Sequence, residues 1–254
     1  MTERPYFDHP TAAVRYAAAR PYVHPQIVQR MAALMQCDHF GTALDVGCGT
    51  GQSTQALAAI ADSVIGVDPS EAMLACADPH SSIAYHVGNA ESLPVADGSA
   101  ELITVGLAWH WLDPLQFLAE VQRVLRSGGW LAIYNSAFNG DVPARPSFRD
   151  WHLNDYLKTY PSPARQTRLP DTFPLHEFGL THPRRDQFVV TAVMSHGQFV
   201  EYLLTQTNII AVVERGTLSL DAVRERLRRE TEVLFAGESV EIPFRADLHL
   251  LRKE

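Results

Sequence analysis

Three glycines at alternate positions indicate a ligand site more clearly than any other feature of the sequence. Gly47, Gly49 and Gly51 follow a short apolar segment that reads as a buried strand, and a helical pattern begins at Gln52. Glycines here let a ligand approach the backbone closely and permit turn conformations that other residues avoid. The following helix presents free backbone N–H groups to whatever lies in the turn. The sequence therefore predicts that a ligand binds at the end of this strand.

An acidic residue, Asp68, follows the next apolar segment, residues 63–67. In a βαβ unit, a carboxylate at this place can accept hydrogen bonds from two ribose hydroxyls, which indicates a cofactor that contains a nucleoside. The fingerprint of dinucleotide-binding proteins needs Gly or Ala where this chain has Gln52. A nicotinamide oxidoreductase is therefore disfavoured.

The order of these motifs resembles that of class I methyltransferases that depend on S-adenosylmethionine (SAM). Asp45 precedes the three glycines, Asp68 follows, and residues 88–94 and 125–129 come next at the spacings of that family. Near the amino terminus, the run from Tyr16 to Pro21 is similar to the Tyr-x-x-x-Arg-Pro segment of one subgroup. That subgroup contains the trans-aconitate-methyltransferase-like enzymes of the broader "type 11" family. The resemblance covers residues 6–137 and rests only on element order beyond them.

The resemblance implies SAM as the cofactor and assigns roles around it. Asp68 would bind the ribose, Asn89 the adenine edge, and Arg20 a carboxylate of the cofactor or of the substrate. Asp45 would support the ammonium group indirectly, or would only hold the turn; Asn89 could equally be a turn residue. The implied cofactor-binding residues are Tyr16, Arg20, Asp45, Gly47, Gly49, Gly51, Asp68, Pro69, Met73, Asn89, Ala90, Glu91 and Ala108.

Aromatic and titratable side chains gather after the fourth expected strand, in Trp109-His110-Trp111. The carboxyl end of that strand should face the methyl donor, so His110 is the candidate base, or only shapes the pocket. The tryptophans could place aromatic faces around the sulfonium and the acceptor. If strand geometry persists, both tryptophans lie on one side and His110 on the other. The residues expected to contact the substrate are Trp109, His110, Arg145 and Arg149.

Composition bounds the classes of function. The 254 residues are 46% hydrophobic, which suits one large domain, and the net charge of −8 argues against a dedicated nucleic-acid binder. Three cysteines without a Cys-x-x-Cys pair predict neither a disulfide framework nor a metal site, and favour a reducing, cytoplasmic location. The polar residues 1–9 and the lack of an apolar run of about 18 residues predict no signal peptide and no membrane contact. Monomer and homodimer both stay open.

Strands and helices alternate through the first half of the chain, which predicts an α/β fold with a doubly wound, seven-stranded and mostly parallel sheet. We expect residues 1–40 to form an amino-terminal helical cover, 41–137 the SAM-binding core, 138–185 an inserted lid, and 186–254 the strands and helices that complete the sheet. The expected strands are residues 42–46, 63–67, 83–87, 102–106, 130–134, 186–194 and 240–251. The expected helices are residues 11–19, 25–36, 52–61, 71–77, 115–125, 148–159, 196–207 and 219–235.

The function predicted from these residues is methyl transfer from SAM to a small-molecule acceptor. A carboxylic acid acceptor would be methylated without deprotonation, whereas a hydroxyl or carbon acceptor would need a base such as His110. A protein that binds SAM without turnover is the remaining alternative. The identity of the acceptor is not encoded in any motif that we recognise.

Overall fold

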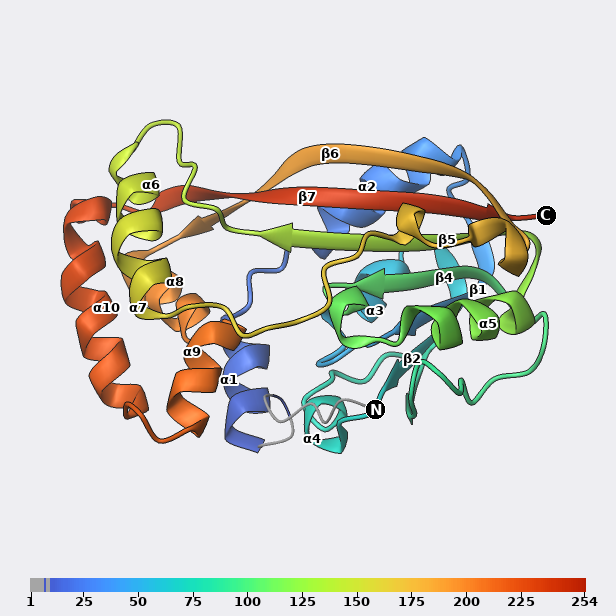
Figure 1. The fold of residues 1–254 in the computed structure, drawn as a ribbon, viewed down its shortest axis with the longest axis horizontal. Helices are drawn as coiled ribbons and strands as arrows, with labels where there is room; N and C mark the ends of the chain where they lie inside the picture. Colours follow the sequence, from blue (N-terminus) through green and yellow to red (C-terminus); the bar gives the residue numbers. More distant parts are fainter. Residues whose placement is uncertain (1–6, 8–9) are drawn as a thin grey trace.

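A seven-stranded sheet runs through the molecule in the order β3-β2-β1-β4-β5-β7-β6 (Figure 1). The computed structural model describes residue 7 and residues 10–254. Strands β1 to β5 are mutually parallel where they pair, and β7 runs antiparallel to both β5 and β6. The predicted α/β fold is therefore confirmed. The strands are β1 Phe40–Val46, β2 Ala61–Asp68, β3 Ile83–Val87, β4 Ala100–Gly106, β5 Leu125–Ala137, β6 Leu180–Met194 and β7 Val240–Lys253.

Helices cover both faces of the sheet and one of its ends. The faces are each lined by a hydrophobic core, and alternate strand residues divide between the two. Leu102 belongs to the core beneath α2 and α3, while its neighbour Ile103 belongs to the core beneath α5. Strands buried on both faces read as continuous apolar runs, as they do here. The helices are α1 Pro10–Ala19, α2 His24–Met35, α3 Gln52–Leu57, α4 Glu71–Leu74, α5 Pro114–Val124, α6 Ser147–Trp151, α7 Leu157–Thr159, α8 His196–Leu203, α9 Thr207–Glu214 and α10 Leu220–Phe235.

A group of helices, α6 to α10 with α1 beside them, lies beyond the carboxyl ends of β4 and β5 (left in Figure 1). Aromatic rings hold this group together. The Phe148 ring lies 5.6 Å from that of Phe199 and 5.4 Å from that of Phe235, both in edge-on arrangements. The expected helix over residues 148–159 is α6, a π-helical turn and α7 in succession. Because Phe148 is fully buried, this part of the segment belongs to a packed core.

The carboxyl-terminal half departs from expectation in two places. The helix predicted over residues 196–207 is two helices, because α8 ends at Leu203 and α9 begins at Thr207. The Thr205 hydroxyl donates to the Tyr202 carbonyl at 2.6 Å. Threonine side chains often bond to a backbone carbonyl about one turn earlier, in competition with the hydrogen bonds that would continue the helix. Strand β6 begins at Leu180, earlier than the predicted residue 186.

Pro243 shows how an interior strand accommodates proline. It lies opposite Thr191 of β6, on the part of β7 beyond its pairing with β5, which stops at Arg245. The Thr191 N–H and carbonyl are bound by the Gln26 side chain of α2, at 3.1 and 2.9 Å, so they point away from β7. No ladder hydrogen bond is therefore lost at Pro243, which agrees with the expectation of an edge-like environment.

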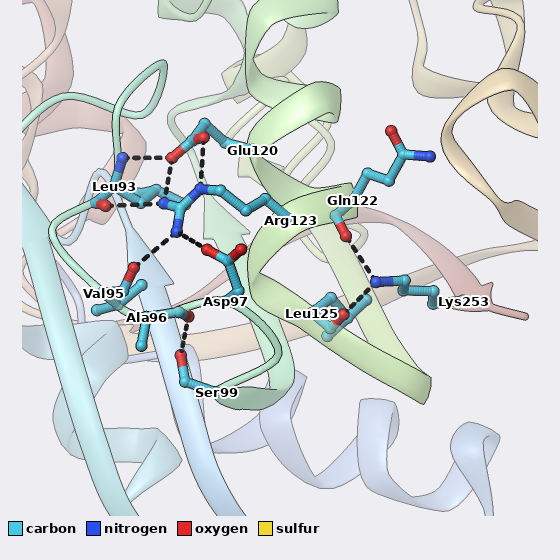
Figure 2. A network of polar contacts seen from close by, with 10 residues as sticks. All are labelled: Leu93, Val95, Ala96, Asp97, Ser99, Glu120, Gln122, Arg123, Leu125 and Lys253. Atoms are coloured by element: carbon cyan, nitrogen blue, oxygen red, sulfur yellow. Dashed lines mark hydrogen bonds and ion pairs between the residues drawn. The ribbon is translucent and has the colours of Figure 1, made fainter.

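The loop between β3 and β4 is tied to α5 by one arginine (Figure 2). The Arg123 guanidinium donates to the carbonyls of Leu93 at 3.0 Å and Val95 at 2.9 Å, and to the Asp97 carboxylate at 2.8 Å. It also donates to both oxygens of Glu120, whose carboxylate accepts in turn from the Leu93 N–H at 2.7 Å. We call these five residues the Arg123 cluster. Their contacts fix the loop that follows the predicted adenine-binding run.

Lys253, near the end of β7, closes the other end of the same region. Its ammonium group donates to the carbonyls of Gln122 and Leu125, where α5 passes into β5 (Figure 2). Carbonyls at the end of a helix have no partner within the helix, and a lysine there is favourable. Among the described residues, no helix has both the length and the apolar character needed to cross a membrane.

Candidate functional site

A cavity lies at the carboxyl ends of the central strands. Asp68 at the end of β2 lines it, as do Gly47 after β1 and Leu107 after β4, together with Asn135 of β5 and Tyr16 of α1. Strand β1 pairs with β2 on one side and with β4 on the other, so the strand order reverses at this point. In open α/β sheets, ligands bind in the crevice at such a reversal. The sequence motifs therefore converge where the fold favours binding.

The glycine turn adopts the backbone conformation that the sequence predicts. Gly47 and Gly49 have φ of 72° and 56°, and both line the cavity. A Cβ on Gly47 would lie 2.5 Å from that of Ala108, so only glycine fits there. Gly51 has φ of 79° but does not line the cavity; it precedes α3 and is packed beneath Tyr85. Two of the three glycines therefore line the cavity, and their contact with a ligand stays a prediction.

Asp68 joins the two turns beside the cavity. Its carboxylate accepts hydrogen bonds from the backbone N–H groups of Gly49 and Ser70, both at 2.9 Å, and only 4% of the residue is exposed. Ser70 caps α4 by accepting from the Met73 N–H, as predicted. Met73 and Ser70 line the cavity, whereas Pro69 does not. Asp68 is therefore placed both to hold the glycine turn and to face a ligand.

Asp45 lies beneath the turn and does not reach the cavity. It is fully buried, and its oxygens accept from the hydroxyls of Ser53 at 2.6 Å, Thr54 at 2.7 Å and Thr104 at 2.8 Å. Burial raises the pKa of the Asp45 carboxyl, and the three hydroxyl donors oppose that shift. Of the two predicted roles, the geometry favours support of the turn and of the start of α3.

Some buried polar atoms of the residues that line the cavity have no hydrogen-bond partner among the described residues. The Arg20 guanidinium lies over the rings of Tyr16 and Tyr202, at 4.6 and 5.6 Å, and donates to the Thr205 carbonyl at 3.1 Å. Buried polar groups are usually hydrogen-bonded, so unpaired ones beside a cavity indicate a ligand that completes them. Within the described part of the chain, the buried and unpartnered atoms that line this cavity are Arg20 Nε, Thr50 Oγ1, Gln52 Oε1 and Gln206 Nε2.

The Trp109–Trp111 segment is a 3₁₀ turn, which corrects the expected strand alternation. Trp109 is buried, and its indole N–H donates to the Arg168 carbonyl at 2.8 Å, so it anchors the segment after α7; it lines an adjoining second cavity and not this one. His110 and Trp111 line the cavity together, with ring centroids 4.8 Å apart. A tight turn directs successive side chains differently from a strand, which explains why Trp109 and Trp111 part.

The arginine nearest His110 is one that the sequence did not single out. Arg165 Nη1 lies 3.3 Å from His110 Nε2, and both residues line the cavity. Partial burial lowers the pKa of Arg165. The predicted substrate arginines lie elsewhere: Arg145 binds the Leu234 carbonyl and the Glu238 carboxylate, and Arg149 pairs with Asp141. Neither Arg145 nor Arg149 lines the cavity, so the structure does not bring them to a substrate there.

The run Asn89-Ala90-Glu91 lies on the loop after β3 and outside the cavity lining. Asn89 forms an isolated bridge with Ser92, Ala90 is buried in the core beneath α5, and the Glu91 carboxylate accepts from the Asp113 N–H at 2.9 Å. Contact of this run with an adenine ring stays a prediction. The fixed position of the loop follows from its attachment to the Arg123 cluster.

A second cavity adjoins the first and shares Leu107, Ala108, His110, Asn135 and Arg165 with it. Buried His249 of β7 lines this second cavity, and burial lowers its pKa. Leu107 stands at the junction with a positive φ of 58°, a strained conformation for a residue with a side chain. The shared lining makes the two cavities parts of one site.

Several lining residues escaped the sequence reasoning. Nothing in the local pattern marks Arg165, and Gln206 lies far from every motif in the chain. In the sequence, Gln52 was noted only because it occupies the position where a dinucleotide fingerprint has glycine or alanine. Among the described residues, no group of three or more His, Cys, Asp or Glu side chains is arranged to hold a metal ion. The lining residues that were not predicted include His24, Gln52, Leu107, Arg165 and Gln206.

Comparisons with known proteins agree with this geometry. Residues 44–133 match the family model of the methyltransferase domain. An uncharacterized methyltransferase of Mycobacterium tuberculosis is 42% identical over 93 residues, which are 35% of this chain and 37% of that protein. The malonyl-[acyl-carrier protein] O-methyltransferase of Pectobacterium atrosepticum is 36% identical over 106 residues, 41% of this chain and 42% of that protein. The matched part thus spans well under half the length of these relatives.

A solved structure extends the likeness to the whole fold. A type II methyltransferase from Anaeromyxobacter dehalogenans superposes with a TM-score of 0.70 at 23% identity, over 92% of this chain and 97% of that one. The sheet order, with its single reversed strand, is that of the class I methyltransferase fold. The chain therefore has the class I methyltransferase fold, and its residues 44–133 are similar to the methyltransferase domain.

Proposed function

We propose that the protein transfers a methyl group from SAM to a small-molecule acceptor. The observation that carries the proposal is the cavity in which Gly47, Gly49 and Asp68 meet the unpartnered atoms of Arg20 and Gln206. Backbone close to the turn suits the sulfur and ribose portions, the Asp68 carboxylate suits the ribose diol, and the unpartnered donors suit a carboxylate. These residues therefore fit SAM.

SAM supplies a methyl group that its sulfonium already activates. The remaining task of this chain is to align the acceptor with that methyl group and to exclude water. Trp111 and Tyr16, which line the cavity, supply aromatic surface beside the expected sulfonium position. Phe7 packs edge-on against both rings, with centroids 6.4 and 5.6 Å away.

The acceptor class that the geometry favours is a carboxylic acid, converted to its methyl ester. Arg165 replaces Arg145 and Arg149 as the arginine available to bind it, because it lies against His110 at the junction of the two cavities. No carboxylate of the described residues pairs with Arg165. A guanidinium binds a carboxylate through two parallel hydrogen bonds and would orient one oxygen toward the methyl group. The Pectobacterium relative is named for O-methylation of a malonyl group, which ends in a carboxylate.

A hydroxyl or carbon acceptor would need a base, and His110 is the candidate. An arginine has no lone pair, so in the contact with Arg165 the His110 Nε2 must be the acceptor. That nitrogen is then already bound to a donor, and Arg165 would have to move before His110 could take a proton from the acceptor. The contact therefore favours a role in orienting an anion over a role as a base.

The test uses SAM labelled in its methyl group with a panel of small carboxylic acids, alcohols and amines. We expect label transfer to a carboxylic acid, retention of a substantial rate in His110→Asn, and loss of most activity in Arg165→Lys, since an ammonium cannot reproduce the planar fork. Arg149→Lys is the matched control because Arg149 lies outside the cavity. Abolition of turnover in His110→Asn with SAM binding intact would favour a hydroxyl or carbon acceptor. SAM binding without S-adenosylhomocysteine release would favour a non-catalytic protein.

A further inference from the structure

The second cavity lies between the sheet and a stretch of chain that has little regular structure. Residues 165–170, which we call the covering segment, line it from one side. Ile133 of β5 and Asp247 and His249 of β7 line it from the other. In Figure 1 the chain between α7 and β6, which includes the covering segment, passes over β5. This cavity therefore has walls of its own beside those that it shares with the first.

The sheet side of the cavity carries a polar pair where an interior strand is usually apolar. Leu248 and Leu250 belong to the core beneath α2 and α3, so Asp247 and His249, which alternate with them, point to the opposite face. His249 lies opposite Ile133 in the register of β7 with β5. Strands buried on both faces normally read as apolar runs, so a buried histidine on this face needs an explanation.

His249 has a hydrogen-bonding atom that the protein leaves unsatisfied. The residue is 4% exposed, and its Nε2 is buried without a hydrogen-bond partner among the described residues. Asp247 Oδ1 lies 3.7 Å from it, beyond hydrogen-bonding distance, and accepts from Arg185 Nε at 2.9 Å. A carboxylate oxygen has two lone pairs, so Oδ1 can accept once more. One ligand atom at hydrogen-bonding distance from Nε2 and Oδ1 would complete both.

The charges around this pair favour a neutral ligand group. Burial lowers the pKa of His249, so its ring is largely neutral at neutral pH. The Asp247 carboxylate would repel an anion, and its partner Arg185 would repel a cation. A hydroxyl both donates and accepts through one oxygen, so it can satisfy Nε2 whichever ring nitrogen carries the proton. The pair therefore suits a hydroxyl group.

Apolar side chains line the rest of the cavity. Trp109 uses its indole N–H to bind the Arg168 carbonyl at 2.8 Å, so what it offers a ligand is the apolar surface of its ring. Ile133, Leu169 and Pro170 are the other apolar residues beside it. Such walls suit an aliphatic chain.

We propose that the second cavity selects the acceptor, and that the acceptor is a hydroxylated aliphatic carboxylic acid. Its carboxylate lies at Arg165, its aliphatic chain lies against Trp109 and Ile133, and its hydroxyl binds His249 and Asp247. The proposal rests on the proposed function and narrows the class of acceptor. It makes His249 a residue that determines specificity and does not touch the cofactor.

The first experiment measures binding and needs no turnover. Hexanoate, octanoate, decanoate and dodecanoate are each compared by calorimetry with their ω-hydroxy derivatives, in the presence of S-adenosylhomocysteine. For at least one chain length, we expect the hydroxy acid to bind roughly tenfold more tightly, the effect of two hydrogen bonds, and the two acids to differ by less than about twofold in His249→Phe. His86→Phe is the matched control, because His86 is exposed on β3 and lines neither cavity.

The second experiment uses the wild-type protein, so it does not depend on the folding of a variant. The ¹⁵N signals of the His249 ring are identified by their loss in His249→Gln. We expect these signals to shift when the preferred ω-hydroxy acid is added and to shift much less with the unsubstituted acid of the same length. A hydroxy acid that binds more tightly without shifting them would contradict the contact with His249.

The outcomes separate this proposal from the proposed function. Equal affinity for the two acids at every chain length, no binding of either series, or a preference that survives in His249→Phe would overturn the role of the second cavity. Methyl transfer to an acid without any preference for a hydroxyl would leave the proposed function intact and contradict this inference alone. A preference that is lost in His249→Phe, without methyl transfer to any acid, would support this site and contradict the proposed function.

Discussion

Two arginines in two polar regions differ in how fully the protein itself satisfies their hydrogen bonds. In the Arg123 cluster, every nitrogen of the guanidinium donates to an acceptor of the protein (Figure 2). At the cavity, Arg20 donates through Nη2 to the Thr205 carbonyl, while its Nε is buried without a partner among the described residues. The difference is that Arg20 keeps a buried N–H group without an acceptor among the described residues, whereas Arg123 does not. A complete set of hydrogen bonds stabilises a fold, and an incomplete buried set is completed by a ligand.

The strongest test of this comparison is at the glycine turn. Gly49→Val should reduce SAM affinity more than a hundredfold, because a side chain is strained at φ of 56° and its Cβ would lie 3.0 Å from Met73 Cε in the cavity wall. Calorimetric titration measures the effect. Gly98→Val is the control, since Gly98 has φ of 59° but open space around it. Equal affinity in Gly49→Val and the wild-type protein would remove the turn from the site.

The second prediction concerns the satisfied cluster. Arg123→Ala should lower the free energy of unfolding by roughly 2 kcal/mol, because buried carbonyls of the loop lose their donor and Glu120 loses its partner. Urea denaturation measures the loss. SAM affinity of the folded variant should fall much less than in Gly49→Val, since Arg123 does not line the cavity and acts only through the loop that it holds. A large loss of affinity at unchanged stability would contradict the division between the two clusters.

Asp68 both holds the glycine turn and lines the cavity, so its replacement should lower both the stability of the protein and its affinity for SAM. Asp68→Ala should weaken SAM roughly tenfold or more, because the ribose hydroxyls lose a charged acceptor worth about 1.5–3 kcal/mol. A smaller loss of stability should accompany it, since the N–H groups of Gly49 and Ser70 lose their acceptor. Asp68→Asn, which keeps an acceptor oxygen but not the charge, should fall between. An unchanged dissociation constant in Asp68→Ala would exclude Asp68 from the site.

Sequence reasoning succeeded where the signal is local. The apolar runs located the strands of the core, and the glycine spacing placed Gly47 and Gly49 at the cavity, because both depend on a few neighbouring residues. The N-cap at Ser70 was likewise visible from one serine before a helical pattern. The order of these elements along the chain then predicts the sheet reversal, and with it the place of the site.

What escaped prediction depends on residues far apart in the chain. Arg165 and His110 are separated by 55 positions, and Arg20 and Thr205 by 185. Arg145 and Arg149 look equivalent to Arg165 in the sequence, yet each forms a salt bridge with a carboxylate away from the cavity, Glu238 and Asp141 respectively. The side chains of Trp109 and Trp111 separate for a different reason, since a 3₁₀ turn took the place of the expected strand, and Trp109 lines the second cavity. Which arginine stays available is settled by tertiary packing alone.

The smallest expected effect is the pH dependence that Glu120 gives to the Arg123 cluster. The hydrogen bond from Arg123 holds the pKa of Glu120 below its ordinary value of 4.5. Because the folded-state pKa is the lower one, the resulting stability is present above the unfolded pKa and is lost as the pH falls through the folded pKa. Between about pH 5 and pH 3, the wild-type protein should therefore lose more unfolding free energy than Glu120→Gln, which cannot ionise. Urea denaturation across this range measures the difference.

Asp97→Asn is the control, because the Asp97 side chain pairs with the same arginine but is 80% exposed, so solvent screens its contribution. Parallel pH profiles for wild type and Glu120→Gln would show that the charge of Glu120 adds no stability to the Arg123 cluster. The contrast with the cavity would then lie only in whether the N–H groups of each arginine have hydrogen-bond acceptors in the protein.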